Sequence, residues 1–527
     1  MKWLLLVFIL SISLSNYSFA DGTSGPGAGT GANYEGSNQT GPGALSGPRY
    51  IGGFSNTGAG YNGSIVTGSP TPPTTPELTI VLYMMDDVDS DIMTAYGGTV
   101  PAGASTPNID RLSTDGARFT QAYVAQLCQL TKEMINAGQW GFRTTQPYSV
   151  DIDHSFGKMA KATGSVPLLY GKAYPGGTNN WGMMQMGWDE AYALYALIPS
   201  PGYRQWTLVS QTQDAYDDAL IAPGGLESND PITVEGMATY AQDYFDDEAI
   251  SGYLNRDRNT QLLIWNSPPL LHDPRHIPNA DIPNNTCPAP NTSDDCFAAM
   301  VNKMDASIGK LLGSFDLSTT LIFILPDNSR SAKGTLYEGG IRVPMWVIGA
   351  GVTPGSTITD AVSGPDIYTT ILDILGTTTY GGSATLDGYS FSTLIGYSCG
   401  WTGRCWINRT GEVYGVSYNL GSAVNGVRIY RDTDHVTYGN YKLWYENQSQ
   451  NVWLYNLSSY PGYGSESANL CTDLTCSNLT STNLDAYNHL CAGLNALDTT
   501  LTPDCPALGG GGASLWGSMI WGTDLWE

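Results

Sequence analysis

The sequence predicts an α/β protein: a large central sheet covered by helices, followed by a smaller antiparallel-sheet domain. Two observations lead to this fold class. Apolar strand-like runs alternate with helical patterns as far as about residue 400, which is typical of α/β proteins. Past Cys405 the chain changes to short runs rich in Tyr and Trp, which predict antiparallel strands. A chain of 527 residues is long enough for both parts.

The large domain is built from apolar runs and capped helices. The runs predict buried strands at 78–84, 262–267, 321–325 and 345–348, and an extended link at 117–124. The first helix has Thr106 as its N-cap, Pro107 at its first position and Gly116 past its end. Apolar residues at helical spacing predict a second helix over 297–315. Gly376 ends a third, over 365–375.

A further short helix is predicted between Cys128 and Gly138, so that Cys128 lies at the helix entrance. Unpaired N–H groups and the helix dipole favour a bound anion there and should lower the pKa of a thiol. Lys132 follows four residues later, on roughly the same helix face. For a lone cysteine, a buried structural role is the alternative interpretation.

The smaller domain follows from four Tyr- and Trp-rich runs. They cover residues 412–418, 426–431, 441–446 and 452–455, and a short helix is expected over 486–497. The expected divisions of the whole chain are a signal peptide (1–20), a flexible leader rich in Gly, Ser and Thr (21–76), the large domain (77–400), the antiparallel subdomain (401–490) and a tail (491–527).

The first 20 residues indicate export. Lys2 precedes the apolar run 3–14, and Ser18-x-Ala20 has the form of a cleavage site. No later apolar run is long enough to span a bilayer, so we expect a secreted or periplasmic protein without a transmembrane segment. The net charge of −25, with only 23 Lys and Arg, predicts repulsion of nucleic acid and anionic lipid. An anion site must therefore concentrate its few cations locally.

Nine cysteines are present, and eight of them fall into close pairs. The pairs are Cys287/Cys296, Cys399/Cys405, Cys471/Cys476 and Cys491/Cys505. In an exported protein, four disulfides are plausible from these pairs. The cysteine left over is Cys128.

Polar side chains follow three of the predicted strands. Asp86-Asp87, His272 and Asp327-Asn328 all come just past strand ends, where ligands bind in α/β sheets. The four oxygen-donor residues suit Ca²⁺ or Mg²⁺ rather than zinc. Lys172 and Lys333 each adjoin a glycine, which allows close approach to a ligand. Solvated acidic loops and solvated lysines are the alternatives, but the three strand ends together favour one shared site.

The motif order over about residues 77–470 resembles the type I sulfatases of the alkaline-phosphatase superfamily. The motifs are Ile80-Val-Leu, Asp86-Asp87, Thr106-Pro-Asn-Ile-Asp-Arg-Leu112, Gly116-Ala-Arg-Phe-Thr-Gln-Ala-Tyr123, Cys128, Gly171-Lys172, Gly187-Trp-Asp-Glu190, His272-Asp-Pro274, Met304-Asp-Ala-Ser-Ile-Gly309, Asp327-Asn328, Lys333-Gly-Thr-Leu-Tyr-Glu-Gly-Gly-Ile-Arg-Val-Pro344, Leu386-Asp-Gly388 and Trp453-Leu-Tyr-Asn-Leu457. The resemblance implies an alkaline-phosphatase-like mixed sheet and hydrolysis of sulfate esters, with sulfated glycans as a reasonable substrate class.

The resemblance also implies roles for the site residues. A formylglycine-generating enzyme would oxidise Cys128 to formylglycine, whose hydrate attacks the sulfur of the ester. A divalent metal, usually calcium, would lie beside that residue and be held by Asp86, Asp87, Asp327 and Asn328. Lys172 and Lys333 would bind sulfate oxygens, and His272 would act at the leaving oxygen or on the sulfate. Lys132 stands where the family's arginine steadies the hydrate.

The sequence departs from the family pattern in three places. In the Cys-x-Pro-x-Arg signal, Leu130 replaces proline and Lys132 replaces arginine. After Gly171-Lys172, Ala173-Tyr174 stands in place of Trp-His, and Ser329 replaces the glycine after Asp-Asn. The altered cysteine signal and the low-complexity leader keep one alternative open, a catalytically silent sulfatase-like protein that binds a sulfated ligand. A phosphate or phosphonate ester hydrolase on the same fold is a second alternative, because phosphorus and sulfur oxyanions have similar shapes and members of the superfamily cross-react.

Overall fold

The computed structural model of this chain describes most of the residues between 78 and 508. The described residues are 78–141, 143, 152–172, 183, 186–194, 206–212, 233–237, 240–273, 275, 277, 294–381, 385–408, 412–419, 422–446, 449–458, 469–471, 476, 478–479, 481–499, 501 and 503–508. The predicted signal peptide and leader therefore lie outside them, as does 509–527. Within the described part, no helix is both long and apolar enough to cross a membrane.

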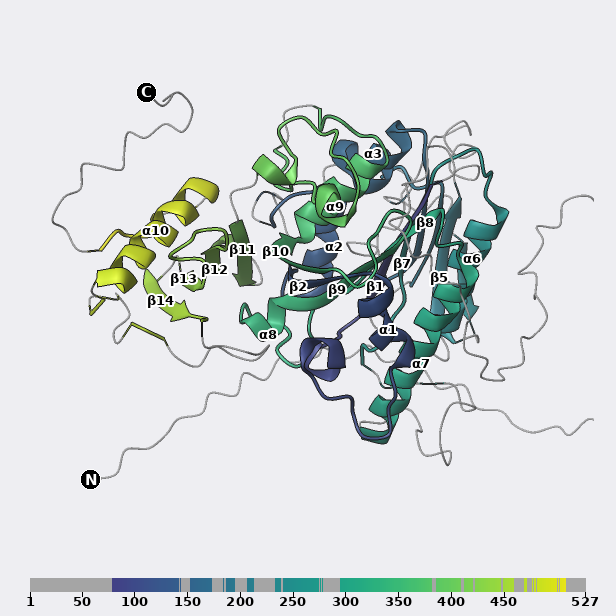
Figure 1. Cartoon of the computed structure of the whole chain (residues 1–527), viewed down its shortest axis with the longest axis horizontal. Coiled ribbons are helices and arrows are strands. Elements are labelled where there is room, and N and C mark those ends of the chain that lie inside the picture. The colour runs from purple at the N-terminus through teal and green to yellow at the C-terminus, as the bar shows by residue number, and fades with distance from the viewer. Residues whose placement is uncertain are drawn as a thin grey trace, which may run out of the picture. The chain divides into compact units, whose positions relative to one another are not determined.

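A ten-stranded mixed sheet forms the centre of the large domain (Figure 1). Its strand order is β10-β2-β9-β8-β1-β7-β3-β4-β5-β6. The strands are β1 (Thr79–Met85), β2 (Ala117–Tyr123), β3 (Val166–Gly171), β4 (Glu190–Leu194), β5 (Trp206–Thr212), β6 (Thr233–Met237), β7 (Leu262–Ser267), β8 (Thr320–Pro326), β9 (Arg342–Gly349) and β10 (Thr357–Ser363). From β8 through β1, β7 and β3 to β4, neighbours are parallel, whereas β9 is antiparallel to both β8 and β2.

Helices cover both faces of this sheet, so the predicted architecture is confirmed. The described helices are α1 (Pro107–Asp115), α2 (Cys128–Ala137), α3 (Phe156–Ala162), α6 (Ala241–Asn255), α7 (Asp294–Ser314), α8 (Glu338–Ile341), α9 (Gly364–Ile374) and α10 (Ser481–Leu497), with 3₁₀ turns η1 (Ser90–Ile92), η2 (Thr94–Tyr96), η3 (Ile152–His154), η6 (Ser392–Ile395) and η7 (Trp406–Asn408). One apolar cluster joins α2, α3 and α9 to one face of the sheet. Another joins α1, α6 and α7 to the opposite face (Figure 1).

β1 shows why helices cover both faces of the sheet. Its residues are all buried, and they alternate between the two clusters. Ile80 and Leu82 belong to the cluster with α2 and α9, whereas Val81 and Tyr83 belong to the cluster with α1 and α7. A strand with two apolar faces is stable only in the middle of such a sandwich. The carboxyl end of β1 therefore lies at the centre of the sheet edge.

The predicted antiparallel subdomain is also present. Its sheet has the order β11-β12-β13-β14, formed by β11 (Glu412–Asn419), β12 (Ser422–Asp432), β13 (Tyr441–Glu446) and β14 (Asn451–Asn456). Leu443 and Leu454 from the sheet share an apolar cluster with Leu490 and Leu494 of α10. Because α10 runs from 481 to 497, it crosses residue 490, where the sequence led us to expect the subdomain to end. The domain boundaries themselves stay predictions.

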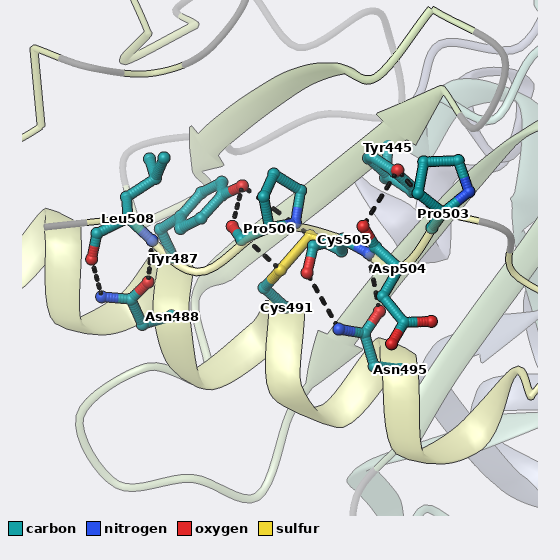
Figure 2. The surroundings of a disulfide bond; sticks show 10 residues. All are labelled: Tyr445, Tyr487, Asn488, Cys491, Asn495, Pro503, Asp504, Cys505, Pro506 and Leu508. Atoms are coloured by element: carbon teal, nitrogen blue, oxygen red, sulfur yellow. Dashed lines mark hydrogen bonds between the residues drawn. A yellow bond between two sulfur atoms is a disulfide. The ribbon is translucent and has the colours of Figure 1, made fainter. Parts of the chain in front are cut away.

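Three predicted disulfides are present, namely Cys399–Cys405, Cys471–Cys476 and Cys491–Cys505. Cys296 is also disulfide-bonded; its predicted partner, Cys287, lies outside the described residues. Cys128 is the free cysteine of the described part. Figure 2 shows how the segment after Cys505 follows α10. Asn495 bonds both the N–H and the carbonyl of Cys505, and Asn488 does the same for Leu508.

Candidate active site

The oxygen-donor residues meet at the carboxyl ends of two neighbouring parallel strands. Asp86 and Asp87 directly follow β1, and Asp327 and Asn328 directly follow β8. The backbone N–H of Asp87 donates to Asp327 Oδ1 (3.2 Å), and Asn328 Nδ2 donates to Asp87 Oδ1 (2.6 Å). Asp87 has φ = +57°, a left-handed conformation that is uncommon outside glycine. This turn holds the two acidic side chains at one place.

Three lysines from three different segments each pair with one of the three carboxylates. Lys132 Nζ, from α2, lies 2.7 Å from Asp327 Oδ2. Lys172 Nζ, directly after β3, lies 2.7 Å from Asp86 Oδ2, and Lys333 Nζ lies 2.6 Å from Asp87 Oδ1. Lys132 and Lys172 are buried, whereas Lys333 is partly exposed. In a chain with net charge −25, the local charge of this site is thus balanced pair by pair.

The mutual attraction of these charges changes their pKa values. Burial alone would raise the pKa of Asp86, but the ammonium groups of Lys172 and Lys132 outweigh it, and the pKa falls below its usual value. Burial likewise opposes the charge on Lys132, yet the carboxylates of Asp327 and Asp86 raise its pKa. Both groups are therefore ionised at neutral pH, which preserves the ion pairs.

His272 joins the site from the segment after β7. Its Nε2 lies 3.7 Å from Asp87 Oδ2, and the side chain is largely buried. Asp86, Asp87 and His272 can each bring one ligand atom to within 4.8 Å of the other two. Asp327 lies outside this group; Lys132 donates to its Oδ2 and the N–H of Asp87 donates to its Oδ1.

The donor set fits a hard divalent cation. Both carboxylate oxygens of Asp86 and Oδ1 of Asn328 are buried and have no hydrogen-bond donor among the described residues. Although Lys172 lies 2.7 Å from Asp86, the pair lacks hydrogen-bond alignment. Buried oxygens without donors are costly unless a cation or another partner binds them. Carboxylate and amide oxygens are the ligands that Ca²⁺ and Mg²⁺ take.

Cys128 is the first residue of α2, as predicted from the sequence. Leu127, at the N-cap, makes no side-chain capping bond, which leaves the N–H groups of the first turn open to an anion. Cys128 is 9% exposed. The predicted lowering of its thiol pKa is wrong: burial raises it, against the opposing effect of Lys172. An unmodified thiol here is thus a poor nucleophile at neutral pH.

One contributor to the site, Asp89, was missed from the sequence. Asp89 accepts hydrogen bonds at Oδ1 from the side chain of Ser329 and from the backbone N–H groups of Arg330 (2.7 Å) and Ser331 (2.8 Å). It thereby holds the loop that leads from Asn328 to Lys333. Ser329, in place of glycine, is explained by this bond. The acidic run at 86–89 was the available signal, but Asp89 was not distinguished from a solvated acid.

Leu130 has a packing role. Its buried side chain belongs to the apolar cluster that also contains Met134, Trp140 and Tyr414. The proline position of the family signal is therefore occupied here by a residue of an apolar cluster that α2 and β11 share. The residues at Ala173 and Tyr174, the second departure, lie outside the described residues.

Comparison with known proteins identifies the family. The family model described as Sulfatase matches residues 79–377, a range that contains every site residue named above. The chain belongs to the sulfatase family. Its fold is accordingly the sulfatase fold of the alkaline-phosphatase superfamily, with the mixed sheet and the small antiparallel sheet described above.

Sulfatase relatives match at low identity. N-acetylgalactosamine-6-sulfatase of Sus scrofa is 24% identical over 365 residues, which are 59% of this chain and 64% of the relative. The chain thus spans less than two thirds of that protein. A sulfatase of Formosa agariphila is 23% identical over 481 residues, covering 75% of this chain and 84% of the relative. A solved protein in complex with its substrate D-glucosamine-2-N,6-O-disulfate has a TM-score of 0.60 and 16% identity, covering 82% of this chain and 99% of that one.

Proposed function

We propose that this protein hydrolyses sulfate esters, with a formylglycine derived from Cys128 as the source of the nucleophile. The single observation that supports this most is the meeting of three lysines, His272 and the oxygen-donor cluster beside the first turn of α2. A sulfate ester presents its anionic oxygens to a site of this kind. The formylglycine hydrate supplies an oxygen nucleophile where the thiol itself is poorly ionised.

The proposed metal is Ca²⁺ or Mg²⁺, held by Asp86, Asp87, Asp327 and Asn328. When bound, it neutralises developing negative charge and makes a nearby hydroxyl more acidic. Because these four residues follow β1 and β8, the sheet fixes their positions. The fit rests on buried oxygens of Asp86 and Asn328 that have no hydrogen-bond donor in the described part of the chain.

The three lysines and His272 have separate proposed roles in binding and cleaving the sulfate ester. Lys172 and Lys333 bind sulfate oxygens and stabilise their charge in the transition state. Lys132 stays paired with Asp327 and orients that carboxylate next to Cys128. His272 donates a proton to the leaving oxygen, which makes departure of the alcohol easier. All four side chains already lie together at one edge of the sheet, so none of these roles requires a rearrangement.

The substrate class that we propose is a sulfated glycan, encountered outside the cytoplasm after export by the signal peptide at 1–20. The disulfides of the C-terminal part support an oxidising compartment. The relative from Sus scrofa carries the name of a sugar sulfatase, and the solved relative binds a sulfated glucosamine. We propose a formylglycine-generating enzyme as the partner that modifies Cys128.

A second candidate is a sulfatase-like protein that binds a sulfated ligand without cleaving it. Leu130 favours it, because this residue is committed to packing instead of forming the usual oxidation signal. In that case the cluster would bind sulfate, and Cys128 would remain a thiol.

Mass spectrometry of the Cys128 peptide from natively produced protein separates the two candidates. We expect at least part of it to carry formylglycine, and we expect the protein to cleave an aryl sulfate faster than the matching phosphate or phosphonate ester. Cys128→Ala is the matched control and should bind sulfate but lose turnover. A fully unmodified thiol together with no turnover would contradict the proposal and favour the binding protein. Faster cleavage of the phosphate or phosphonate ester would instead favour a phosphate or phosphonate ester hydrolase on the same fold.

A further inference from the structure

The loop that carries Lys333 is attached to two parts of the active site. Lys333 itself reaches Asp87, with an Nζ–Oδ1 distance of 2.6 Å. The next residue, Gly334, donates its N–H to the carbonyl of Gln126 (2.9 Å). Gln126 precedes Cys128 by two residues. The loop therefore lies between the oxygen-donor cluster and the entrance of α2, and a shift of its backbone would move Lys333.

A buried ionic cluster from the antiparallel sheet holds the far end of the same loop. Lys442 Nζ, in β13, donates to the carbonyl of Leu336 (2.6 Å) and to Glu338 Oε1 (3.1 Å). Tyr123 OH, at the end of β2, donates to Glu338 Oε2 (2.9 Å), and Arg431, in β12, approaches the same oxygen at 3.5 Å. One carboxylate thus ties together both sheets and the loop.

Adhesion between the sheets does not require these charges. Leu336, Val413 and Ile429 already form an apolar cluster at the same place. Glu338 and Lys442 are both fully buried, and burying an ion pair costs free energy that a packed apolar pair would not. The ion pair instead fixes the position of the loop backbone, because the ammonium of Lys442 binds the carbonyl of Leu336, three residues past Lys333. Buried ionic groups of this kind can specify one conformation.

We propose that Lys442 and Glu338 are positioning residues for Lys333, and that the antiparallel sheet thereby supports the sulfate-binding site. The inference rests on the proposed function in one respect, namely that Lys333 binds the sulfate group. Neither Lys442 nor Glu338 contacts the ligand in this proposal. Both act through the backbone of the loop.

The test is a double-mutant cycle read out by binding of inorganic sulfate in calorimetry. Lys442→Met should weaken sulfate binding by about ten-fold, because a small displacement of a binding group has an effect of that order or more. In the Lys333→Ala background the same substitution should have little further effect, since the group that it positions is gone. Lys442→Arg keeps the charge and should restore part of the affinity. Lys310→Met, on the exposed side of α7, is the control.

Additive effects of the Lys442 and Lys333 substitutions on sulfate binding would contradict the positioning role. If Lys442→Met weakens sulfate binding equally in both backgrounds, or changes it less than about two-fold, the proposal is wrong. Where Lys442→Met does not fold, Tyr123→Phe takes its place in the cycle, because it removes one hydrogen bond to Glu338 and leaves no charge unpaired. The cycle needs no turnover. If the two substitutions are coupled in sulfate binding but the protein cleaves no sulfate ester, the proposed hydrolase activity is wrong and the positioning role of Lys442 still holds.

Discussion

The ammonium of Lys132 and the carboxylate of Asp327 form a buried ion pair, with 2.7 Å between Nζ and Oδ2. The pair joins α2, whose first residue is Cys128, to the end of β8. The nucleophile position and the oxygen-donor cluster are thereby fixed to each other.

Removal of the Lys132 ammonium should destabilise the fold. Lys132→Met leaves Asp327 buried without its cation, which should lower the free energy of unfolding by about 3 kcal/mol in urea titrations. Lys132→Arg should be less damaging, since it keeps the charge. The matched control is Lys310→Met, because the pair of Lys310 with Asp247 is exposed and its loss should hardly move the midpoint. Equal midpoint shifts would argue against a special role for the buried pair.

Metal binding should depend on the cluster at β1 and β8. Asp86→Ala and Asp327→Ala should each remove the bound divalent cation, as measured by elemental analysis, and should abolish the rise in melting temperature when Ca²⁺ is added to chelated protein. Asp295→Ala, on the exposed start of α7, should behave like the unmodified chain. An unchanged metal content in both cluster variants would refute the assignment.

Anion binding should depend on the lysines of the site, because the net negative charge of the whole chain repels anions. Lys172→Ala and Lys333→Ala should each reduce kcat/KM for an aryl sulfate by about 10²-fold, as expected when a transition-state charge partner is lost. Lys161→Ala and Lys310→Ala remove exposed lysines and should leave kcat/KM close to its starting value. Similar, small losses in all four variants would mean that no sulfate clamp exists.

Acid should destabilise the fold through protonation of Glu338. Burial would raise the pKa of Glu338, but Lys442, Arg431 and Arg342 lower it from 4.5 to about 2. The folded pKa lies below the unfolded one, so this stabilisation is complete above pH 4.5 and is lost as pH falls towards 2. It corresponds to about 3 kcal/mol. Urea titrations over this range should show a weaker pH dependence for Glu338→Gln than for the unmodified chain or Asp295→Asn; an identical dependence would contradict the assignment.

Repair of the oxidation signal should raise the formylglycine content. Leu130 is the third residue of α2, where proline is tolerated because first-turn N–H groups need no partner within the helix. Leu130→Pro with Lys132→Arg should therefore fold, with some loss of packing, and give a larger converted fraction by mass spectrometry. Leu130→Ala with Lys132→Arg controls for the lost packing and should not increase conversion. If the proline variant converts no better, the altered signal is not what limits maturation.

Sequence patterns located the acidic pairs because both follow strongly apolar strands, β1 and β8. They did not reveal β3, which ends at Gly171, directly before Lys172. Pro167 lies within β3, and proline argues against a strand in the interior of a sheet. The polar strand β10 and the helix α6 were also absent from the sequence-based interpretation. Their positions depend on contacts with distant elements.

The burial of charged side chains also could not be predicted from the sequence. Glu338 occurs in a recognised motif, but no sequence pattern indicates that its carboxylate is wholly buried with Lys442 and Arg431, about a hundred residues further along the chain. Charged residues are rarely buried, so the expected place for each of them was the surface. Only the folded arrangement of the two sheets brings them together.

The strand order also sets a minimum length for the side chain at position 172. β7 separates β3 from β1, so the strands that end before Lys172 and Asp86 lie about 10 Å apart at the usual interstrand spacing. The four-carbon stem of lysine spans most of that gap and brings its ammonium to 2.7 Å from Asp86. A histidine there could carry positive charge but has a shorter reach than lysine. At this position, reach constrains the choice of residue as strongly as charge does.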